Sequence, residues 1–133
     1  MEKLLQEIVP RPTLEEDLAR AVEMMTKFAD YFKTTVPRIE VVNKFRGVST
    51  YWRGTSLVRL RRYTERVMLD EAVIHEYAHH LTYQWFDKLA VKPALRPKAH
   101  GKEFYEALLD VVRCWYGDVK KYHWNWEYSS IQN

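Results

Sequence analysis

The sequence is poor in the residues that cross-link or interrupt a fold: its 133 residues include one cysteine, four glycines and five prolines. A single cysteine, Cys114, excludes an internal disulfide and a zinc ribbon built from four cysteines. Because apolar residues flank it, we expect Cys114 to be a buried, unreactive thiol, which fits a reducing compartment. With 47% hydrophobic residues and no repeat, the composition indicates a globular chain and excludes a disordered one.

Long apolar runs are also absent. No segment is long enough to cross a membrane, and the short apolar stretch in residues 1–12 contains acidic residues, which argues against a signal peptide. We therefore expect a cytoplasmic protein with no membrane partner. The length predicts one domain over residues 1–133, with a core over about 13–117 and an aromatic tail over 118–133.

A strong excess of one charge is missing too, since the formal net charge is +3, but the charges are unevenly distributed. Residues 38–66 hold eight Lys or Arg against two Glu, whereas residues 67–87 hold four acidic residues and no Lys or Arg. The basic segment is either a surface for DNA phosphates or a solvated sheet face. The candidate DNA-binding residues are Arg53, Arg59, Arg61, Arg62 and Arg66.

The most informative pattern that is present is His75-Glu76-Tyr77-Ala78-His79. Residues 64–86 contain no Pro or Gly and carry a helical apolar stripe, so the pattern lies on a predicted helix whose two histidines share one face. We interpret His75 and His79 as Zn²⁺ ligands and Glu76 as the general base of a hydrolase. The alternative is an ordinary helix with structural histidines. His80 points about 100° away from His79, so we expect it to be packed or solvated.

A catalytic zinc usually has three protein ligands and a water. We favour His100 as the third ligand, because it follows a Pro-containing loop at the start of a predicted helix over 100–116, where the chain can fold back on the motif helix. The alternatives are Glu103 and Glu106 on that helix, which would complete a site of two His and one Glu, and a residue farther away in the sequence.

Further residues are candidates for supporting roles around the metal. An oxyanion needs a second hydrogen-bond donor, for which Tyr105, His123 and nearby arginines are candidates. Glu71 and Tyr83 lie one turn before and one turn after the histidine pair, where either could orient a ligand. Each of these side chains also has a plain structural interpretation.

The remaining pattern predicts an α+β fold. Thr13 begins a capping box ahead of a helix over 13–32, and β-prone runs between residues 39 and 60 predict two or three short strands. The motif helix follows, then a loop over 87–99 and a last helix that ends at a C-cap, Gly117. The aromatic tail either packs on the domain, which we favour, or offers stacking platforms for unpaired bases.

The segment His75–His80, followed by His100-Gly101-Lys102-Glu103-Phe104, resembles the SprT-like (Spartan) metalloprotease family, whose pattern is HExxH followed by HGxxF or HGxxW. Segments 46–51 and 56–60 are similar to the family's strands ahead of its active-site helix, so the resemblance extends from about residue 38 to 116. With one cysteine, the chain resembles a minimal member without the zinc ribbon.

The resemblance implies a zincin-like domain in which His75, His79 and His100 hold one Zn²⁺ and Glu76 is the base. It also implies an intracellular protease that cleaves proteins bound or crosslinked to DNA, with single-stranded or structured DNA as activator. Two alternatives stay open: a zinc peptidase with a dedicated protein target and no DNA dependence, and a non-catalytic, zinc-stabilised DNA- or protein-binding module.

Overall fold

The structure, a computed structural model, describes residues 11–88 and 100–124, and within these it is an α+β arrangement of three α-helices and a three-stranded sheet. The predicted loop over 87–99 and the tail beyond residue 124 lie almost wholly outside this description. Among the described residues, no helix is long and apolar enough to span a bilayer.

Helix α2 (Leu14–Phe32) begins at the predicted capping box. The Thr13 hydroxyl accepts the Glu16 N–H at 3.1 Å, and the Glu16 carboxylate accepts the Thr13 N–H at 3.0 Å. These two bonds satisfy donors that a helix start leaves without intrahelical partners. The buried apolar side chains recur at helical spacing and form one face of the core: Ala21, Met24, Met25, Phe28 and Ala29.

The sheet has the order β1-β3-β2, formed by β1 (Arg38–Val41), β2 (Thr50–Trp52) and β3 (Leu57–Leu60). β1 runs parallel to β3, and β2 runs antiparallel to it. Side chains alternate between the two faces of a strand, so the cross-strand row Ile39, Val58 and Tyr51 faces the helices, whereas Arg59 faces outward. The predicted short strands are therefore confirmed as three.

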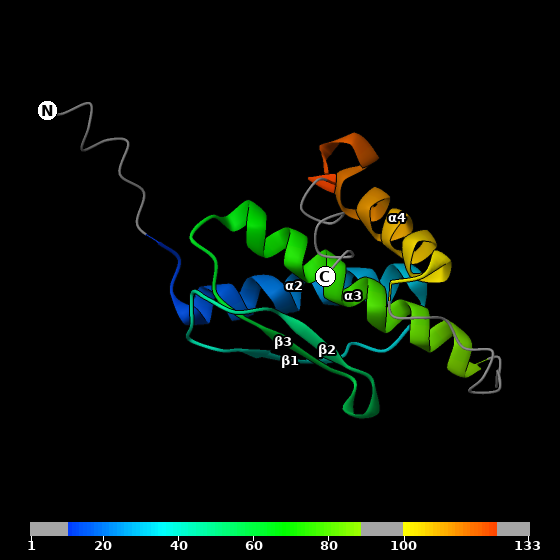
Figure 1. Cartoon of the computed structure of the whole chain (residues 1–133), viewed down its shortest axis with the longest axis horizontal. Helices are drawn as coiled ribbons and strands as arrows, with labels where there is room; N and C mark the ends of the chain where they lie inside the picture. Colours follow the sequence, from blue (N-terminus) through cyan, green and yellow to red (C-terminus); the bar gives the residue numbers. More distant parts are fainter. Residues whose placement is uncertain (1–10, 89–99, 125–133) are drawn as a thin grey trace, which may run out of the picture.

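The helices form two layers over one face of this sheet. α2 packs over β1, and α3 (Arg66–Lys88) packs over β2 and β3; α4 (Lys102–Tyr116) covers the other side of α3 (Figure 1). The predicted bounds of α3 and α4 each started two residues early. In α3 the first turn is anchored by the Glu65 carbonyl, which accepts the N–H groups of Met68 and Leu69. The left-handed Gly117 (φ 77°) ends α4 as predicted.

After α4, the described part of the aromatic tail packs on the molecule, as predicted. A short 3₁₀ turn, η3 (Val119–Lys121), leads to Tyr122, which is buried, and the Trp124 ring nitrogen donates to the Val119 carbonyl at 2.7 Å. Trp126 and Tyr128 lie outside the described residues. Cys114 is only half-buried, so the prediction of a buried thiol was wrong: Cys114 packs against the core, whereas Val111 and Val112 on the same helix lie within it.

Candidate metal centre

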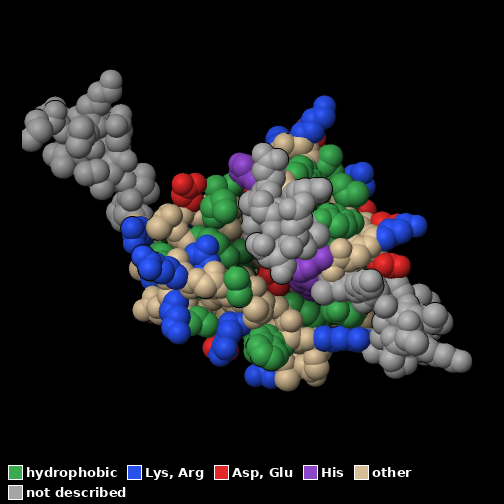
Figure 2. Space-filling model, in the orientation of Figure 1, with side chains coloured by type: hydrophobic (Ala, Val, Ile, Leu, Met, Phe, Trp, Pro, Cys, Tyr) green, Lys and Arg blue, Asp and Glu red, His purple; other side chains and the backbone are tan. Residues whose placement is uncertain are grey.

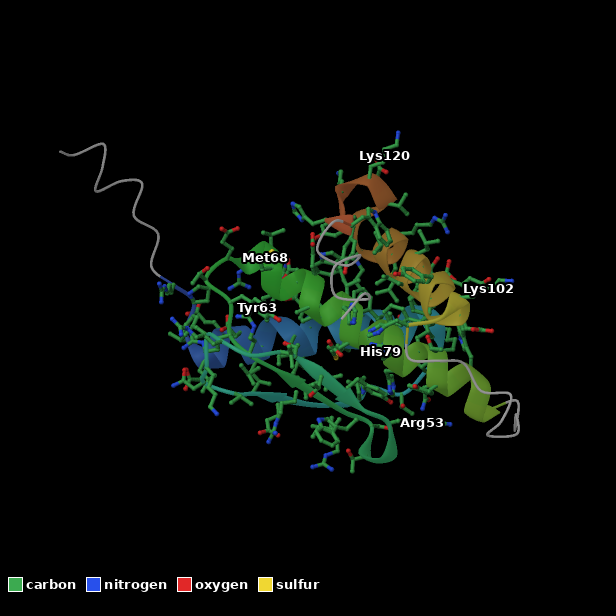
Figure 3. The ribbon with its side chains drawn as sticks, in the orientation of Figure 1. Arg53, Tyr63, Met68, His79, Lys102 and Lys120 are labelled. Atoms are coloured by element: carbon green, nitrogen blue, oxygen red, sulfur yellow. The ribbon has the colours of Figure 1, made fainter. Side chains whose placement is uncertain are left out.

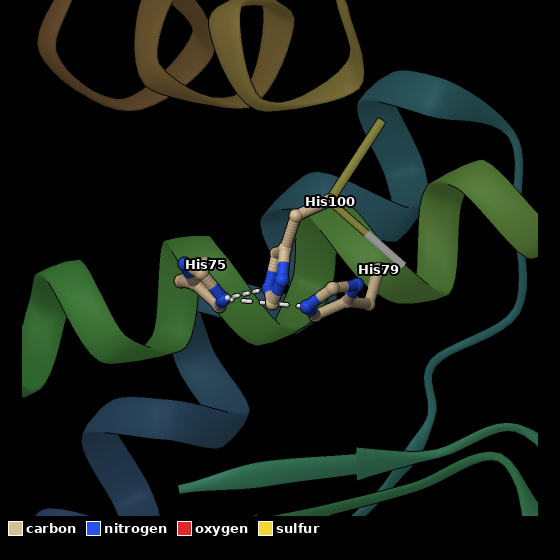
Figure 4. Close-up of side chains that lie close together, drawn as sticks. All are labelled: His75, His79 and His100. Carbon is tan, nitrogen blue, oxygen red and sulfur yellow. Dashed lines mark hydrogen bonds between the residues drawn. The ribbon is translucent and has the colours of Figure 1, made fainter. Parts of the chain in front are cut away.

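Three histidines from two helical regions converge on one point. His75 and His79 are one turn apart on α3, and the Nε2 atom of His75 lies 3.2 Å from Nε2 of His79. His100, just before α4, brings its Nε2 atom to 3.3 Å from that of His75 (Figure 4). All three side chains offer a nitrogen within 4.8 Å of the others, so they are close enough to bind a metal ion.

These separations fit a tetrahedral ion. Two ligand nitrogens at about 2.0–2.1 Å from Zn²⁺ lie about 3.3–3.4 Å apart at a tetrahedral angle. Among the described residues, the group has three members, and neither Glu103 nor Glu106 belongs to it. The structure therefore favours His100 over both glutamates as the third ligand.

The environment keeps an imidazole neutral, which is the form that binds metals. His75 and His79 are buried, with exposed fractions of 4% and 8%. Burial, reinforced by the positive charge that His75 and His100 would carry, lowers the pKa of His79 to about 2. Protonation of His79 would place a charge in a poorly solvated pocket, so the neutral imidazole is favoured. Its nitrogen lone pair is then available to bind a metal ion.

Phe104 forms the floor beneath all three histidines. It is fully buried, and its ring centroid lies 4.3 Å from that of His79 and 5.1 Å from those of His75 and His100. His100 lies just before α4 and Phe104 lies in its first turn, so packing of Phe104 in the core also positions the His100 imidazole through their ring contact. This contact gives a physical role to Phe104, the aromatic residue that ends the HGxxF pattern.

A cavity of about 390 Å³ opens beside the histidines. Its α3 wall consists of two neighbouring rows of side chains, each spaced by four residues, as expected for one helix face. The opposite walls come from the loop before β2, from β2 itself and from the segment between β3 and α3. The two rows are Met68, Ala72 and Glu76, and His75, His79 and Tyr83.

Glu76 lies in this cavity beside the metal-binding group, with an exposed fraction of 6%. A carboxylate next to a metal-bound water can accept its proton. The structure thus places Glu76 in the same cavity as the three histidines, and its role as general base stays a prediction.

His80 is buried and connects strand β2 to the segment that follows α2. Its Nε2 atom lies 2.9 Å from the Thr35 carbonyl, which can only accept, so Nε2 carries the proton. The Nδ1 atom therefore accepts the Tyr51 hydroxyl at 2.9 Å. Burial lowers the pKa of His80, which agrees with a neutral ring. His80 is thus packed, as predicted, and it orients Tyr51.

Tyr51 and Tyr63 are cavity residues that no sequence motif identified. The Tyr51 ring lies nearly parallel to that of His79, with centroids 6.4 Å apart. The Tyr63 hydroxyl lies 2.9 Å from the Ser49 hydroxyl oxygen, and the Arg61 guanidinium lies 3.9 Å from the centroid of the Tyr63 ring. Strand alternation could have placed Tyr51 on the inner face, but Tyr63 follows the last strand, where no periodicity indicates a direction.

The other candidates for supporting roles occupy different positions. Tyr105 and His123 are not among the described residues that line the cavity, whereas Tyr83 is. Glu71 is fully buried and accepts the His123 ring nitrogen at 2.6 Å and the Tyr116 hydroxyl at 3.3 Å. Glu71 therefore joins α3 to the segment after α4.

The five candidate DNA-binding arginines do not form one surface. Arg53 and Arg61 line the cavity, and Arg62 forms an ion pair with the buried Asp17 at 3.0 Å. Arg59 pairs with Glu40 at 3.4 Å on the outer sheet face, and Arg66 is exposed at the start of α3. Figure 2 shows basic side chains spread along the margin over the sheet and the start of α2, which leaves DNA binding as a prediction.

A scan against protein-family models, a search of curated proteins and a search of solved structures each return no match.

Proposed function

We propose that this chain is a zinc-dependent endopeptidase of the SprT-like (Spartan) kind, with a zincin-like fold. The supporting observation is that the Nε2 atoms of His75, His79 and His100 converge beside Glu76 in one open cavity. Three ligands, a neighbouring carboxylate and room for a substrate are what a hydrolytic zinc site needs, whereas a structural zinc takes four protein ligands and needs no base.

In this proposal His75, His79 and His100 would hold a zinc ion, which would supply a Lewis acid that polarises the scissile carbonyl and lowers the pKa of a water molecule. Glu76 accepts the proton of the attacking water and later delivers it to the leaving amine. The buried position of Glu76 keeps it close to the reacting atoms and limits competing solvent.

Tyr63 is our candidate for the donor that stabilises negative charge on the carbonyl oxygen. Ser49 accepts the Arg61 backbone N–H at 3.1 Å, and its hydroxyl oxygen lies 2.9 Å from that of Tyr63. In this proposal Ser49 donates its proton to the Tyr63 oxygen, and Tyr63 donates its own proton to the substrate. Burial, together with the charge of Glu76, raises the pKa of Tyr63, so the hydroxyl stays protonated at neutral pH. Removing one such donor typically lowers kcat about 10²–10³-fold.

The proposed substrates are proteins, in particular proteins associated with DNA, and the basic side chains over the sheet would contact phosphates. Phosphate contacts release counterions, so DNA retention should weaken steeply as salt increases. A chain that cleaves protein but shows no salt-dependent retention would instead be a peptidase with a dedicated protein target.

The test combines metal analysis with cleavage of casein or histone, with and without single-stranded DNA. We expect one zinc per wild-type chain, loss of zinc in His100→Ala, and retained zinc without cleavage in Glu76→Gln. Tyr63→Phe should retain zinc and lose most of kcat, whereas Tyr31→Phe, on the exposed side of α2, should match wild type.

The matched control for the ligand assignment is Glu106→Gln, because Glu106 is the exposed rival on α4. Loss of zinc in Glu106→Gln with retention in His100→Ala would refute the assignment. Stoichiometric zinc with no cleavage of either protein, with or without DNA, would favour a zinc-stabilised binding module.

A further inference from the structure

The loop between β1 and β2 places an exposed apolar side chain beside the cavity. Val48 lines the cavity and is 79% exposed, more than any other large apolar side chain among the described residues. Because it both lines the cavity and is exposed, Val48 lies where the cavity opens to solvent. An apolar side chain in water becomes more stable when a ligand covers it, so Val48 offers contact surface to an apolar group in the cavity.

Contacts on both sides fix the loop around the exposed valine. On one side, the Arg62 guanidinium carbon lies 4.9 Å from the centroid of the Phe45 ring. On the other side, the Ser49 hydroxyl accepts the backbone N–H of Arg61 at 3.1 Å. Between them, Gly47 has a φ of 99°, which L side chains rarely adopt. The loop therefore has a defined path that carries the valine to the cavity.

This path brings Val48 to the N-terminal end of α3. The hydroxyl oxygen of the next residue, Ser49, lies 2.9 Å from that of Tyr63, which stands shortly before α3 begins. Met68 belongs to the first turn of α3, and Figure 3 shows Tyr63 and Met68 toward that end, with His79 farther along the helix. Val48 and Met68 therefore line the cavity at the same end of α3.

The wall that α3 contributes becomes apolar toward this end. Met68, Ala72 and Glu76 form one row with a spacing of four residues, so Ala72 lies one turn before Glu76 and Met68 lies two turns before it. Met68 is half-buried, and Ala72 is 1% exposed. Because Ala72 carries a single methyl group, the wall recedes between its two larger neighbours. The result is a recess with an apolar floor, one turn from Glu76.

The charged side chain near this recess is held by contacts within the protein. Arg61 lines the cavity, and its guanidinium carbon lies 3.9 Å from the centroid of the Tyr63 ring. One guanidinium nitrogen of Arg61 also donates to the carbonyls of Phe45 and Arg62, at 2.8 and 2.9 Å. Arg61 therefore braces the loop, and the apolar side chains of the recess are the groups that a substrate side chain would contact.

We propose that Val48, Met68 and Ala72 form a specificity subsite that receives an apolar side chain of the substrate next to the scissile bond. This inference rests on the proposed function and names the substrate class: peptides with a large apolar residue, such as Leu, Met or Phe, beside the bond that is cleaved. A side chain in the recess removes its own apolar surface and that of Val48 from water, which favours binding. The position of the recess, one turn from Glu76, places that residue beside the reacting carbonyl.

The test measures binding to zinc-loaded Glu76→Gln protein, so that turnover does not interfere. The probes are fluorescein-labelled, amidated peptides Ala-Ser-Ala-Gly-Xaa-Ala-Ser-Ala in which Xaa is Leu, Asn or Glu. Leu and Asn are similar in size, so a difference between them reports polarity rather than volume. We expect the Leu form to bind about tenfold more tightly than the Asn form, since burial of a Leu side chain supports a gain of that size. The Glu form should bind no more tightly than the Asn form.

Variants of the recess test whether it causes this preference. Val48→Ser should reduce the preference for Leu to about threefold, because two methyl groups no longer cover the ligand. Since Val48 is exposed, this change should leave the fold intact, and Val48→Leu should retain the preference. Met68→Ser should reduce the preference from the α3 side of the recess. The matched control is Val36→Ser, an exposed valine outside the described lining, which should retain the full preference.

Three binding results would overturn the subsite. These are equal binding of the Leu and Asn forms, undetectable binding of all three forms, and a preference for Leu that survives both Val48→Ser and Met68→Ser. Tighter binding of the Glu form than of the Leu form would also overturn it, and would indicate that Arg61 contacts the ligand.

Cleavage of the same peptides by the chain with Glu76 intact, with the cleaved bond mapped by mass spectrometry, reports separately on the proposed function. Cleavage beside Leu that weakens in Val48→Ser supports both proposals. Cleavage at bonds away from Xaa, or without a Val48-dependent preference for Leu, refutes the subsite and leaves the peptidase. A Val48-dependent binding preference without any cleavage refutes the peptidase and leaves a binding site for apolar peptide segments.

Discussion

Arg59 and Arg62 lie three residues apart, yet their surroundings differ. The side chain of Arg62 is 13% exposed and its partner Asp17 is 4% exposed, whereas Arg59 and its partner Glu40 are about half exposed. Arg62 also donates to the Asn43 side chain and to the Pro12 carbonyl, which ties the segment before α2 to the end of β3. Burial rather than residue type therefore determines what each ion pair contributes.

We expect Arg62→Ala to lower the free energy of unfolding by about 3–5 kcal/mol, because Asp17 would remain buried without a counter-charge. Arg59→Ala should cost at most about 1 kcal/mol, as is usual for a solvent-exposed pair. Urea denaturation of the two variants measures both effects. Equal losses would show that the Arg62 pair is solvated in solution.

At the scale of elements, the start of α2 depends on reciprocal bonds between Thr13 and Glu16. The backbone and side chain of Thr13 lower the pKa of Glu16 by hydrogen bonding to its ionised form. A carboxylate whose pKa is lowered by folding stabilises the fold above its unfolded pKa and loses that contribution as the pH falls. The cap should therefore weaken as the pH drops below about 4.3, the usual pKa of a Glu in an unfolded chain, and Glu16 takes up a proton.

Thr13→Ala should lower the free energy of unfolding by about 1 kcal/mol at neutral pH, the usual cost of removing an N-cap hydroxyl. The difference from wild type should shrink as the pH falls through the range in which Glu16 protonates, because the carboxylate half of the box is then lost in both proteins. Denaturation at pH 7 and pH 3 checks this. A difference that stays constant with pH would mean that the two halves of the box act independently.

At the scale of the whole molecule, the candidate metal centre connects α3 to the start of α4. Two of its histidines lie on α3 and the third precedes α4, so an ion bound by all three joins segments that are separated in the sequence by residues 80–99. A ligand that binds only the folded state stabilises it by about 2.7 kcal/mol when its free concentration is one hundred times Kd.

Zinc should therefore raise the melting temperature of the wild-type protein by several degrees, and EDTA should reverse the shift. His100→Ala should show a much smaller shift, because two imidazoles on one helix do not cross-link α3 and α4. Thermal unfolding with and without zinc checks this. An equal shift in wild type and His100→Ala would place the stabilising ion elsewhere.

The sequence by itself determined the features that depend on residues within one or two helical turns of each other. These are the capped helix α2, the left-handed end of α4 at Gly117, the helix that carries the motif and the common face of His75 and His79. Local hydrogen bonds and the helical repeat specify such features without reference to the rest of the chain. The position of His100 at the start of the last predicted helix also indicated it as the third ligand, whereas Phe104 was indicated only through the resemblance.

The tertiary structure alone decided which distant side chains share the cavity. Tyr51 and Arg53 interdigitate with His79 and Tyr83 because β2 lies against α3, and Tyr63 enters from a connection whose direction no periodic pattern specifies. The same packing buried Arg62 and left Arg59 exposed, although both belong to one basic segment. Contacts between segments far apart in the chain depend on how whole elements pack, and packing is a property of the assembled core rather than of any short run of residues.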